Sequence, residues 1–192
     1  MVSRQDHCLT DLLYRTRNGE LPIEIALIGS NHRDAYGAAA AEDIDFLHLP
    51  VDETNKLAQE TKLLDEIEQR GVHLVVLARY MQILSAEFCD ALPGRIINIH
   101  HSFLPGFKGA RPYRQAFDRG VKLIGATAHY VTSDLDEGPI IEQGVERVDH
   151  RQGVTDLVSV GRDVERIVLA KAVKYHAEHR VLLNNQKTVV FQ

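Results

Sequence analysis

The stretch "VHLVVLARYMQILSAEFCDALPGRIINIHHS" covers residues 72–102 and holds two apolar runs with a short mixed segment between them. The first run, 72–78, is nearly unbroken, which is typical of a strand buried on both faces in a parallel sheet. The segment 85–94 begins at Ser85, a preferred N-cap residue, and stops at Pro93-Gly94, so it predicts a short helix. A second strand, "RIINIHHS", follows directly. The order strand, helix, strand predicts an α/β sheet.

The same alternation continues on both sides of this stretch. Further strands are predicted at 23–30, 46–51, 122–131 and 138–148, and further helices at 34–43, 55–71, 113–120 and 155–181. The last helix is the longest, with Thr155 or Asp156 as its cap, and Asn184-Asn185 predicts the turn of a C-terminal hairpin. We therefore predict an α/β fold with a doubly wound, mostly parallel sheet and antiparallel strands toward the C-terminus.

Composition excludes several classes of protein. The 192 residues are 44% hydrophobic and 26% charged, which is enough for a packed core. The net charge of −5, with no basic block, makes nucleic acid an unexpected partner. The sequence has neither an apolar run of about 20 residues, which a membrane span needs, nor a signal-peptide core. The two cysteines, Cys8 and Cys89, lack zinc-site spacing and fit the reducing cytoplasm, where we expect the protein.

Asn98, His100 and His101 lie at the end of the predicted strand "RIINIHHS". In open α/β sheets, ligands lie outside the carboxyl ends of the parallel strands. Because side chains alternate across a strand, Asn98 and His100 share one face, and His101 faces the other if the strand stays regular. That arrangement argues against a metal held jointly by the two histidines. An amide and an imidazole on one face can both approach an oxygen that gains negative charge, as acyl or formyl transfer requires.

A second polar cluster follows the predicted strand 122–131. His129 lies on that strand, and Asp134, Asp136 and Glu137 lie on the turn after it. A carboxylate in a partly buried turn can orient water, keep a histidine charged or accept a proton. The acids and the histidine show no reliable metal-ligand spacing, so we expect no metal.

Each of these features has a simpler structural interpretation. A histidine near a strand end is most often hydrogen-bonded for structural reasons, the acidic turn before Pro139 is a common turn sequence, and Met81 suits a core. The three segments nevertheless coincide: each follows a predicted strand, and each carries polar groups. Their coincidence predicts that they line one cleft.

At this point a resemblance can be stated. The stretches "NIHHSFLPGFKGARPY" (98–113) and "GATAHYVTSDLDEGPIIEQ" (125–143) closely resemble the formyltetrahydrofolate-dependent formyltransferase family. The Asn-x-His-x-Ser-x-Leu-Pro pattern, with a later His and Leu-Asp-x-Gly-Pro, is specific to this superfamily, and the likeness covers nearly the whole chain. The double His, "GARPY" (109–113), His7 and Cys8 match its deformylase branch.

The resemblance implies one Rossmann-like catalytic domain over residues 1–192. It also implies that the ACT-type regulatory domain found at the N-terminus of family deformylases is absent, and that the first strand, before "SRQDHCL", is truncated. We expect a homo-oligomer, as in the family. Arg79 and Gln82 differ from the Lys and Arg expected around the pterin segment.

The resemblance implies a catalytic trio of Asn98, His100 and Asp136. In the family the Asn and His contact the formyl oxygen, and the Asp organises the nucleophile and the proton transfers. His129 matches a histidine that supports the Asp, and Ser102 matches a serine near the site. The pterin is expected between two segments, with Met81, Gln82, Ile83 and Leu84 on one side and Val131, Thr132 and Leu135 on the other.

The implied reaction is hydrolysis of 10-formyltetrahydrofolate to tetrahydrofolate and formate, without metal or cofactor. It would supply formate for purine biosynthesis and balance folate pools. One alternative is formyl transfer to an amine such as glycinamide ribonucleotide. Family transferases hold that acceptor's phosphate with a Gly-rich loop, whereas the matching "SRQDHCLTDLL" (3–13) has no glycine. A folate-binding module without turnover is the other alternative, against which the intact trio argues.

Overall fold

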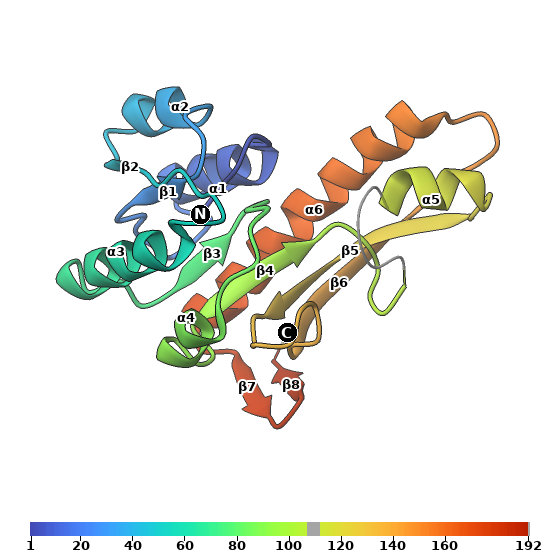
Figure 1. The fold of residues 1–192 in the computed structure, drawn as a ribbon. Coiled ribbons are helices and arrows are strands. Elements are labelled where there is room, and N and C mark those ends of the chain that lie inside the picture. The colour runs from blue at the N-terminus through green and yellow to red at the C-terminus, as the bar shows by residue number, and fades with distance from the viewer. Residues whose placement is uncertain (107–111, 192) are drawn as a thin grey trace.

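The computed structural model describes residues 1–106 and 112–191 (Figure 1). The strands are β1 (Ile28–Ser30), β2 (Phe46–His48), β3 (Val75–Leu77), β4 (Ile96–His100), β5 (Leu123–Tyr130), β6 (Ile140–Arg147), β7 (Val181–Asn184) and β8 (Lys187–Val190). The helices are α1 (His7–Arg17), α2 (Tyr36–Ala41), α3 (Lys56–Gln69), α4 (Ala86–Ala91), α5 (Pro112–Asp118) and α6 (Val154–Ala177).

The described strands fall into three hydrogen-bonded sheets, β1–β2, β3–β4–β5–β6 and β7–β8, and their mixture of parallel and antiparallel pairs confirms the predicted fold class. β1 pairs with β2 in parallel, and β3 pairs with β4 in parallel, whereas β4–β5 and β5–β6 are antiparallel. Met1 and Val2 lie between the two parallel pairs, where the N-terminus is marked in Figure 1. The Val2 N–H donates to the Gly29 carbonyl (3.0 Å), and the Met1 carbonyl accepts from the Ala78 N–H (2.9 Å). Residues 1–2 therefore join β1 to β3 through backbone hydrogen bonds.

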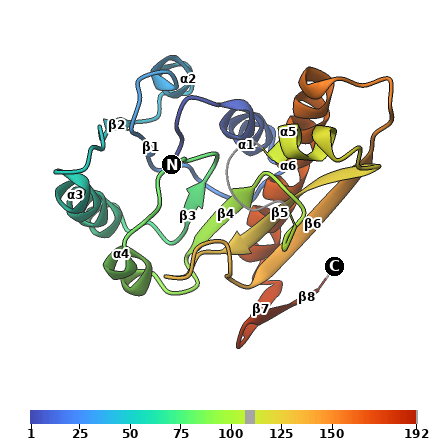
Figure 2. The ribbon, with the colours of Figure 1, turned by 45° about the vertical axis from the view of Figure 1, so that its right-hand side comes forward.

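Helices cover both faces of the sheet (Figure 2). Side-chain alternation along β4 sends Ile97 and Ile99 into a core with α1 and α6, while Ile96 packs into a second core with β3, α3 and α4. Asn98 and His100 lie on the same side of β4 as Ile96. The polar residues of β4 therefore project beyond the α3–α4 core, at the carboxyl end of the strand.

Several predicted strands and helices have the wrong boundaries. The strands predicted at 23–30, 46–51 and 72–78 are shorter, because their outer residues have no ladder partner. Helix α6 is capped at Gly153, whose N–H donates to the Asp156 carboxylate (2.8 Å), so neither Thr155 nor Asp156 is the N-cap residue. It ends at Ala177, four residues before the predicted end.

Ser85 caps α4 as predicted, since its side chain accepts from the Phe88 N–H. The β7–β8 hairpin is also confirmed.

Helix α1 was not predicted, although the sequence carries its signal. Cys8, Leu9, Leu12 and Leu13 are buried at helical spacing. Their burial against α6 and the β1–α2 region makes α1 part of two cores. The helix also brings His7 to the site described below.

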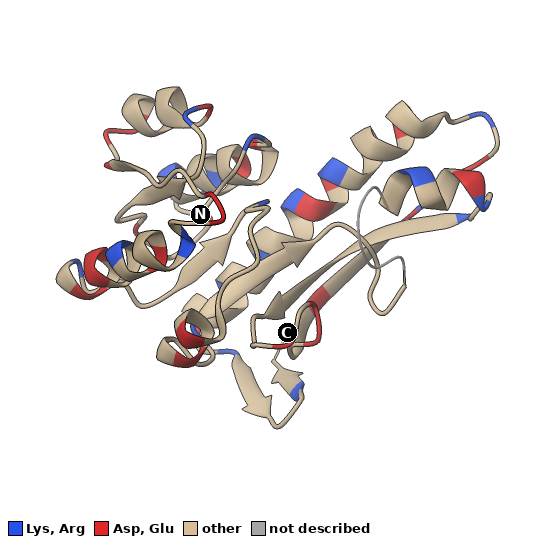
Figure 3. Cartoon of the chain, in the orientation of Figure 1, with Lys and Arg blue, Asp and Glu red and all other residues tan. Residues whose placement is uncertain are grey.

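Charged side chains lie mainly on helices and loops (Figure 3). The central strands β3, β4 and β5 carry no Lys, Arg, Asp or Glu. Among the described residues, no helix is both long and apolar enough to cross a membrane.

Two glycines in helices give a test of packing. A Cβ at Gly161 of α6 would lie 2.2 Å from the buried Tyr113 ring, whereas a Cβ at Gly37 of α2 would meet no atom within 4 Å. We expect Gly161→Ala to destabilise the fold by about 1–3 kcal/mol through overpacking. We expect Gly37→Ala to stabilise it by about 0.5 kcal/mol, because alanine loses less backbone entropy. Urea unfolding of both variants checks this, and equal shifts of the two midpoints would contradict the packing.

Candidate active site

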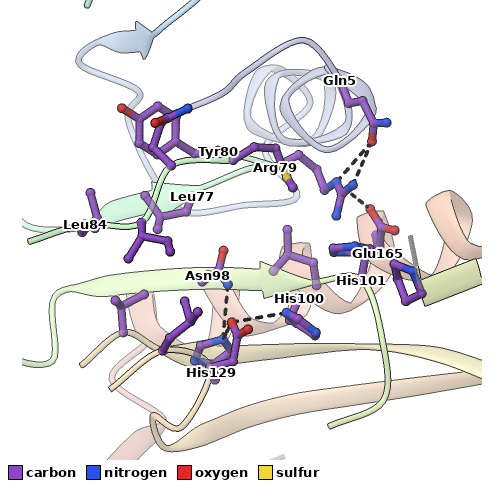
Figure 4. A pocket seen from close by; sticks show the side chains of 18 of the residues that line it. Gln5, Leu77, Arg79, Tyr80, Leu84, Asn98, His100, His101, His129 and Glu165 are labelled. Carbon is purple, nitrogen blue, oxygen red and sulfur yellow. Dashed lines mark hydrogen bonds and ion pairs between the residues drawn. The ribbon is translucent and has the colours of Figure 1, made fainter. Parts of the chain in front are cut away.

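A cavity of about 880 Å³ opens at the carboxyl ends of β3 and β4. Figure 4 shows its two ends, with the labelled Leu77 and Leu84 on one side and Arg79 and Glu165 on the other. We call these ends the apolar limb and the polar limb. The apolar limb is lined by Leu77, Met81, Ile83, Leu84, Val131 and Leu135, and the polar limb by Gln5, Arg79, His101, Tyr113 and Glu165. Asn98, His100 and His129 lie between the limbs. Asp136, which also lines the cavity, lies close to both histidines.

The pairing of β4 with β5 fixes the orientation of Asn98. Asn98 lies opposite His129 in the antiparallel register. His129 Nδ1 lies 2.8 Å from the Tyr130 carbonyl oxygen, so that nitrogen carries the hydrogen and donates it. Burial lowers the pKa of His129, so the ring is neutral and its Nε2 accepts from Asn98 Nδ2 at 3.2 Å. Within the described residues, no further hydrogen bond of the Asn98 side chain is seen, so its second amide hydrogen can meet a ligand.

His100 and Asp136 form a partly buried pair. His100 Nδ1 lies 3.3 Å from Asp136 Oδ1, while His129 Nε2 is farther from the same oxygen, at 3.8 Å. The hydrogen bond from His100 lowers the pKa of Asp136 against the opposing effect of burial, so Asp136 is ionised at neutral pH. His100 Nε2 is buried and has no hydrogen-bond partner among residues 1–106 and 112–191. An unpartnered buried nitrogen is costly unless a ligand meets it.

The turn that carries Asp136 is held by close backbone packing. Asp136 has a φ of +57°, a left-handed conformation that Asp tolerates better than most residues. A Cβ at Gly138 would lie 1.7 Å from the Tyr130 carbonyl oxygen, which is the acceptor of His129. Only glycine permits this approach, so Gly138 fixes the turn against the strand that holds His129.

Ser102 does not line the cavity. Its hydroxyl donates to the Gly106 carbonyl (2.8 Å), and its own carbonyl accepts from the buried Thr127 hydroxyl (3.0 Å). Thr127 in turn accepts from the Leu104 N–H and from the Gln143 side chain, both at 3.0 Å. Ser102 therefore holds the loop after β4, which is a supporting role at a distance from the cavity.

The residues predicted to hold the pterin all line the cavity. Met81 and Ile83 come from the segment after β3, and Leu135 comes from the turn after β5. These three side chains are 58–61% exposed although apolar. The other members of the predicted set on the cavity wall are Gln82, Leu84, Val131 and Thr132. Exposed apolar side chains around a cavity suit a flat ligand that is itself partly apolar.

The placement of His101 on the opposite face was expected only for a regular strand, and this condition is not met because β4 ends at His100. The His101 ring lies against the His100 ring, with centroids 5.2 Å apart, and lines the same cavity. Burial, together with the nearby charge of Arg79, lowers the pKa of His101 to about 4. His101 is therefore uncharged at neutral pH and lines the polar limb. Three residues of the "GARPY" motif, 109–111, lie outside the described residues.

The sequence interpretation missed the polar limb, which is centred on Glu165 of α6. Glu165 is 1% exposed and contacts His7, Arg79 and Tyr113. A signal was present, because Glu165 lies on the apolar stripe of α6, four residues after Gly161 and three before Val168.

The ligand atoms of His7, Cys8 and Glu165 lie within 4.8 Å of one another, as in some metal sites. Two features oppose a cation here. Arg79 Nε lies 3.4 Å from Glu165 and already supplies positive charge. Burial also raises the pKa of Cys8 strongly, so its thiol holds its proton. The group is better described as a hydrogen-bonded network around a carboxylate.

This fold is that of the formyl transferases. A family model described as "Formyl transferase" matches residues 1–173, and the chain therefore belongs to that family. Within the family, the resemblance to the deformylases is confirmed. The chain is 58% identical to a formyltetrahydrofolate deformylase of Synechocystis sp., over 99% of this chain and 66% of that protein.

Solved structures agree with the sequence relatives. The crystal structure of a formyltetrahydrofolate deformylase from Burkholderia mallei is 59% identical with a TM-score of 0.97, over 100% of this chain and 68% of that one. A glycinamide ribonucleotide transformylase 1 from Symbiobacterium toebii is 34% identical with a TM-score of 0.91, over 100% of this chain and 92% of that one. The chain spans about two thirds of the length of the deformylases it matches.

The depressed pKa of His101 gives a pH-dependent stability. The unfolded chain binds a proton at His101 near pH 6.5, but the folded chain does so only near pH 4. The contribution of neutral His101 is therefore complete above pH 6.5 and is lost as the pH falls toward 4. Between pH 7.5 and 5, we expect His101→Gln to lose about 1–2 kcal/mol less unfolding free energy than the parent chain. Urea unfolding at both pH values checks this, with His150→Gln, an exposed histidine, as control. Identical losses for His101→Gln and the parent would contradict the assignment.

Proposed function

We propose that this chain hydrolyses 10-formyltetrahydrofolate to tetrahydrofolate and formate. The observation that carries the proposal is the buried Nε2 of His100, which has no hydrogen-bond partner in the described part of the chain. It lies in one cavity with the oriented amide of Asn98 and the ionised Asp136. An oxygen that gains negative charge would satisfy both donors, and the carboxylate beside them can hold a water.

Asn98 and His100 would stabilise the oxyanion. Water adds to the formyl carbon, and the carbonyl oxygen becomes negative as the carbon becomes tetrahedral. With its Nδ1 hydrogen donated to Asp136, protonated His100 offers an Nε2–H to this oxygen, and Asn98 offers its second amide hydrogen. Both side chains are held before the substrate arrives, so little reorganisation is needed during the reaction.

Asp136 would position the water. Its lowered pKa makes it a weak base, so it orients the water first and takes the proton only as the new C–O bond forms. That proton then passes to the folate nitrogen and the C–N bond breaks, which gives tetrahydrofolate and formic acid. The formic acid gives its remaining proton to the solvent and leaves as formate. Water supplies the oxygen and the protons, so the step balances without a metal or cofactor.

The apolar limb would hold the pterin, with the segment Met81–Leu84 on one side and Val131, Thr132 and Leu135 on the other. A formyl group attached to the folate would then reach Asn98 and His100 at the centre of the cavity. We further propose that the protein acts in the cytoplasm as a homo-oligomer, and that its formate supplies purine biosynthesis and balances folate pools.

Asp136→Asn tests the hydrolysis. We expect this variant to keep folate binding and to lose formate release by about 100-fold or more, because the amide cannot accept the proton of the water. Formate release from 10-formyltetrahydrofolate, without any amine, is measured beside Asp90→Asn, an exposed acid on α4. Near-full activity in Asp136→Asn would sink the mechanism. No formate from the parent chain, with transfer to an added amine, would move it to the transferases. Folate binding without either reaction would make it a binding module.

His100→Ala tests the oxyanion contact. We expect a loss of transition-state stabilisation of about 3 kcal/mol, seen mainly in kcat, as for other oxyanion donors. His100→Gln, which restores one neutral donor, should recover part of that loss. A change confined to KM would contradict this role, because it would assign His100 to substrate binding alone.

A further inference from the structure

We propose that the network of Gln5, His7, Arg79, Tyr113 and Glu165 closes the polar limb against amine acceptors, and so makes water the acceptor of the formyl group. This inference rests on the proposed function and concerns its specificity. The five residues come from the N-terminal loop, α1, the segment after β3, α5 and α6. Gln5, Arg79 and Glu165 lie on the far side of His100 from the apolar limb (Figure 4). His7 and Tyr113 join them through their contacts with Glu165.

The location makes the polar limb the approach route for an acceptor. If the pterin fills the apolar limb, the formyl carbon lies near His100, and the remaining volume of the cavity is the polar limb. The same fold carries an acceptor other than water elsewhere, since the neighbour from Symbiobacterium toebii is named a glycinamide ribonucleotide transformylase. We therefore place part of the discrimination between water and an amine in the side chains of this limb.

Glu165 is the group best suited to bind an acceptor, and this chain occupies it with its own donors. A buried carboxylate next to the reacting centre would hold an ammonium or a hydroxyl group. Its Oε2 instead lies 2.8 Å from His7 Nε2 and 3.4 Å from Arg79 Nε, and its Oε1 accepts from the Tyr113 hydroxyl. Burial opposes the charge, but these three partners lower the pKa of Glu165 below its usual value.

Arg79 and Tyr113 also fill the space of the limb. Arg79 is 7% exposed and has a left-handed φ of +65°, and both its Nε and its Nη2 donate to Gln5 Oε1, at 3.2 and 3.0 Å. Tyr113 is 8% exposed and its ring lies against Gly161, where a Cβ would be 2.2 Å away. Both side chains are therefore held by their contacts, and they occupy space that a bulky acceptor would need beside Glu165.

The consequence for the chemistry is a change of acceptor. If the limb is opened, a primary amine can attack the formyl carbon in place of water. The new C–N bond forms, the bond to the folate nitrogen breaks, and the proton of the amine passes to that nitrogen. An N-formyl amine and tetrahydrofolate result, and no water is consumed.

Two variants open the limb in different ways. Arg79→Asn removes the guanidinium but keeps a residue that tolerates a positive φ. Tyr113→Phe removes the hydroxyl that occupies Glu165 Oε1 and keeps the ring. Tyr14→Phe, an exposed tyrosine on α1, is the matched control. The probe is glycinamide, at a pH of about 8, where part of an α-amino group is uncharged. Formate and N-formylglycinamide are measured in the same reaction.

We expect the ratio of N-formylglycinamide to formate to rise by about 10-fold or more in Arg79→Asn and in Tyr113→Phe. It should stay at the parent value in Tyr14→Phe. The ratio is the deciding quantity, because a network that only stabilises the fold would lower both products together. An unchanged ratio in folded, hydrolysing variants overturns the closure. A parent chain that already formylates glycinamide as fast as it releases formate overturns it as well. A parent chain that releases no formate at all fails the proposed function instead.

Discussion

The register between β4 and β5 is the constraint on which the rest of the site depends. Asn98 faces His129, and His100 faces Thr127. Because side chains alternate, a slip of one residue would turn Asn98 and His100 toward α6 and send Ile97 and Ile99 into the cavity. The packing of those isoleucines in the core with α6 therefore also holds the polar groups in place. The core with α6 and the polar site therefore lie on opposite faces of the same strand, β4.

The sequence predicted the centre of the site because its residues lie in two contiguous motifs, each at the end of a strand. It did not predict the Glu165 network, whose members are far apart in the chain and meet only when α1 and α6 pack together. The strand predicted from residue 23 fails for a related reason. Ile23 and Ile25 do pack against cores, but no neighbouring backbone pairs with them. Alternating apolar residues indicate which side chains are buried, whereas a β-strand also needs a neighbouring backbone with which to form hydrogen bonds.

The site separates two kinds of carboxylate. Asp136 is partly exposed, lies near two histidines, His100 and His129, and belongs to a turn, so it can meet a small molecule. Glu165 lies in the core and is surrounded by donors from three other segments. A buried charge of this kind is tolerated only while its partners remain, so removing a single partner is more damaging than replacing the whole set. The two acids thus differ in how well the fold tolerates their substitution.

The central position of helix α6 limits the ways in which a related protein could gain a new formyl acceptor. Its 24 residues pack against β4, β5 and β6, and Glu165 lies near its middle. Amide hydrogens in such a central helix exchange with solvent chiefly when the whole domain unfolds. Glu165 therefore keeps its place at the cavity wall for as long as α6 stays folded. A descendant of this chain would gain a new acceptor by changing the side chains around α6, and not by making the helix more mobile.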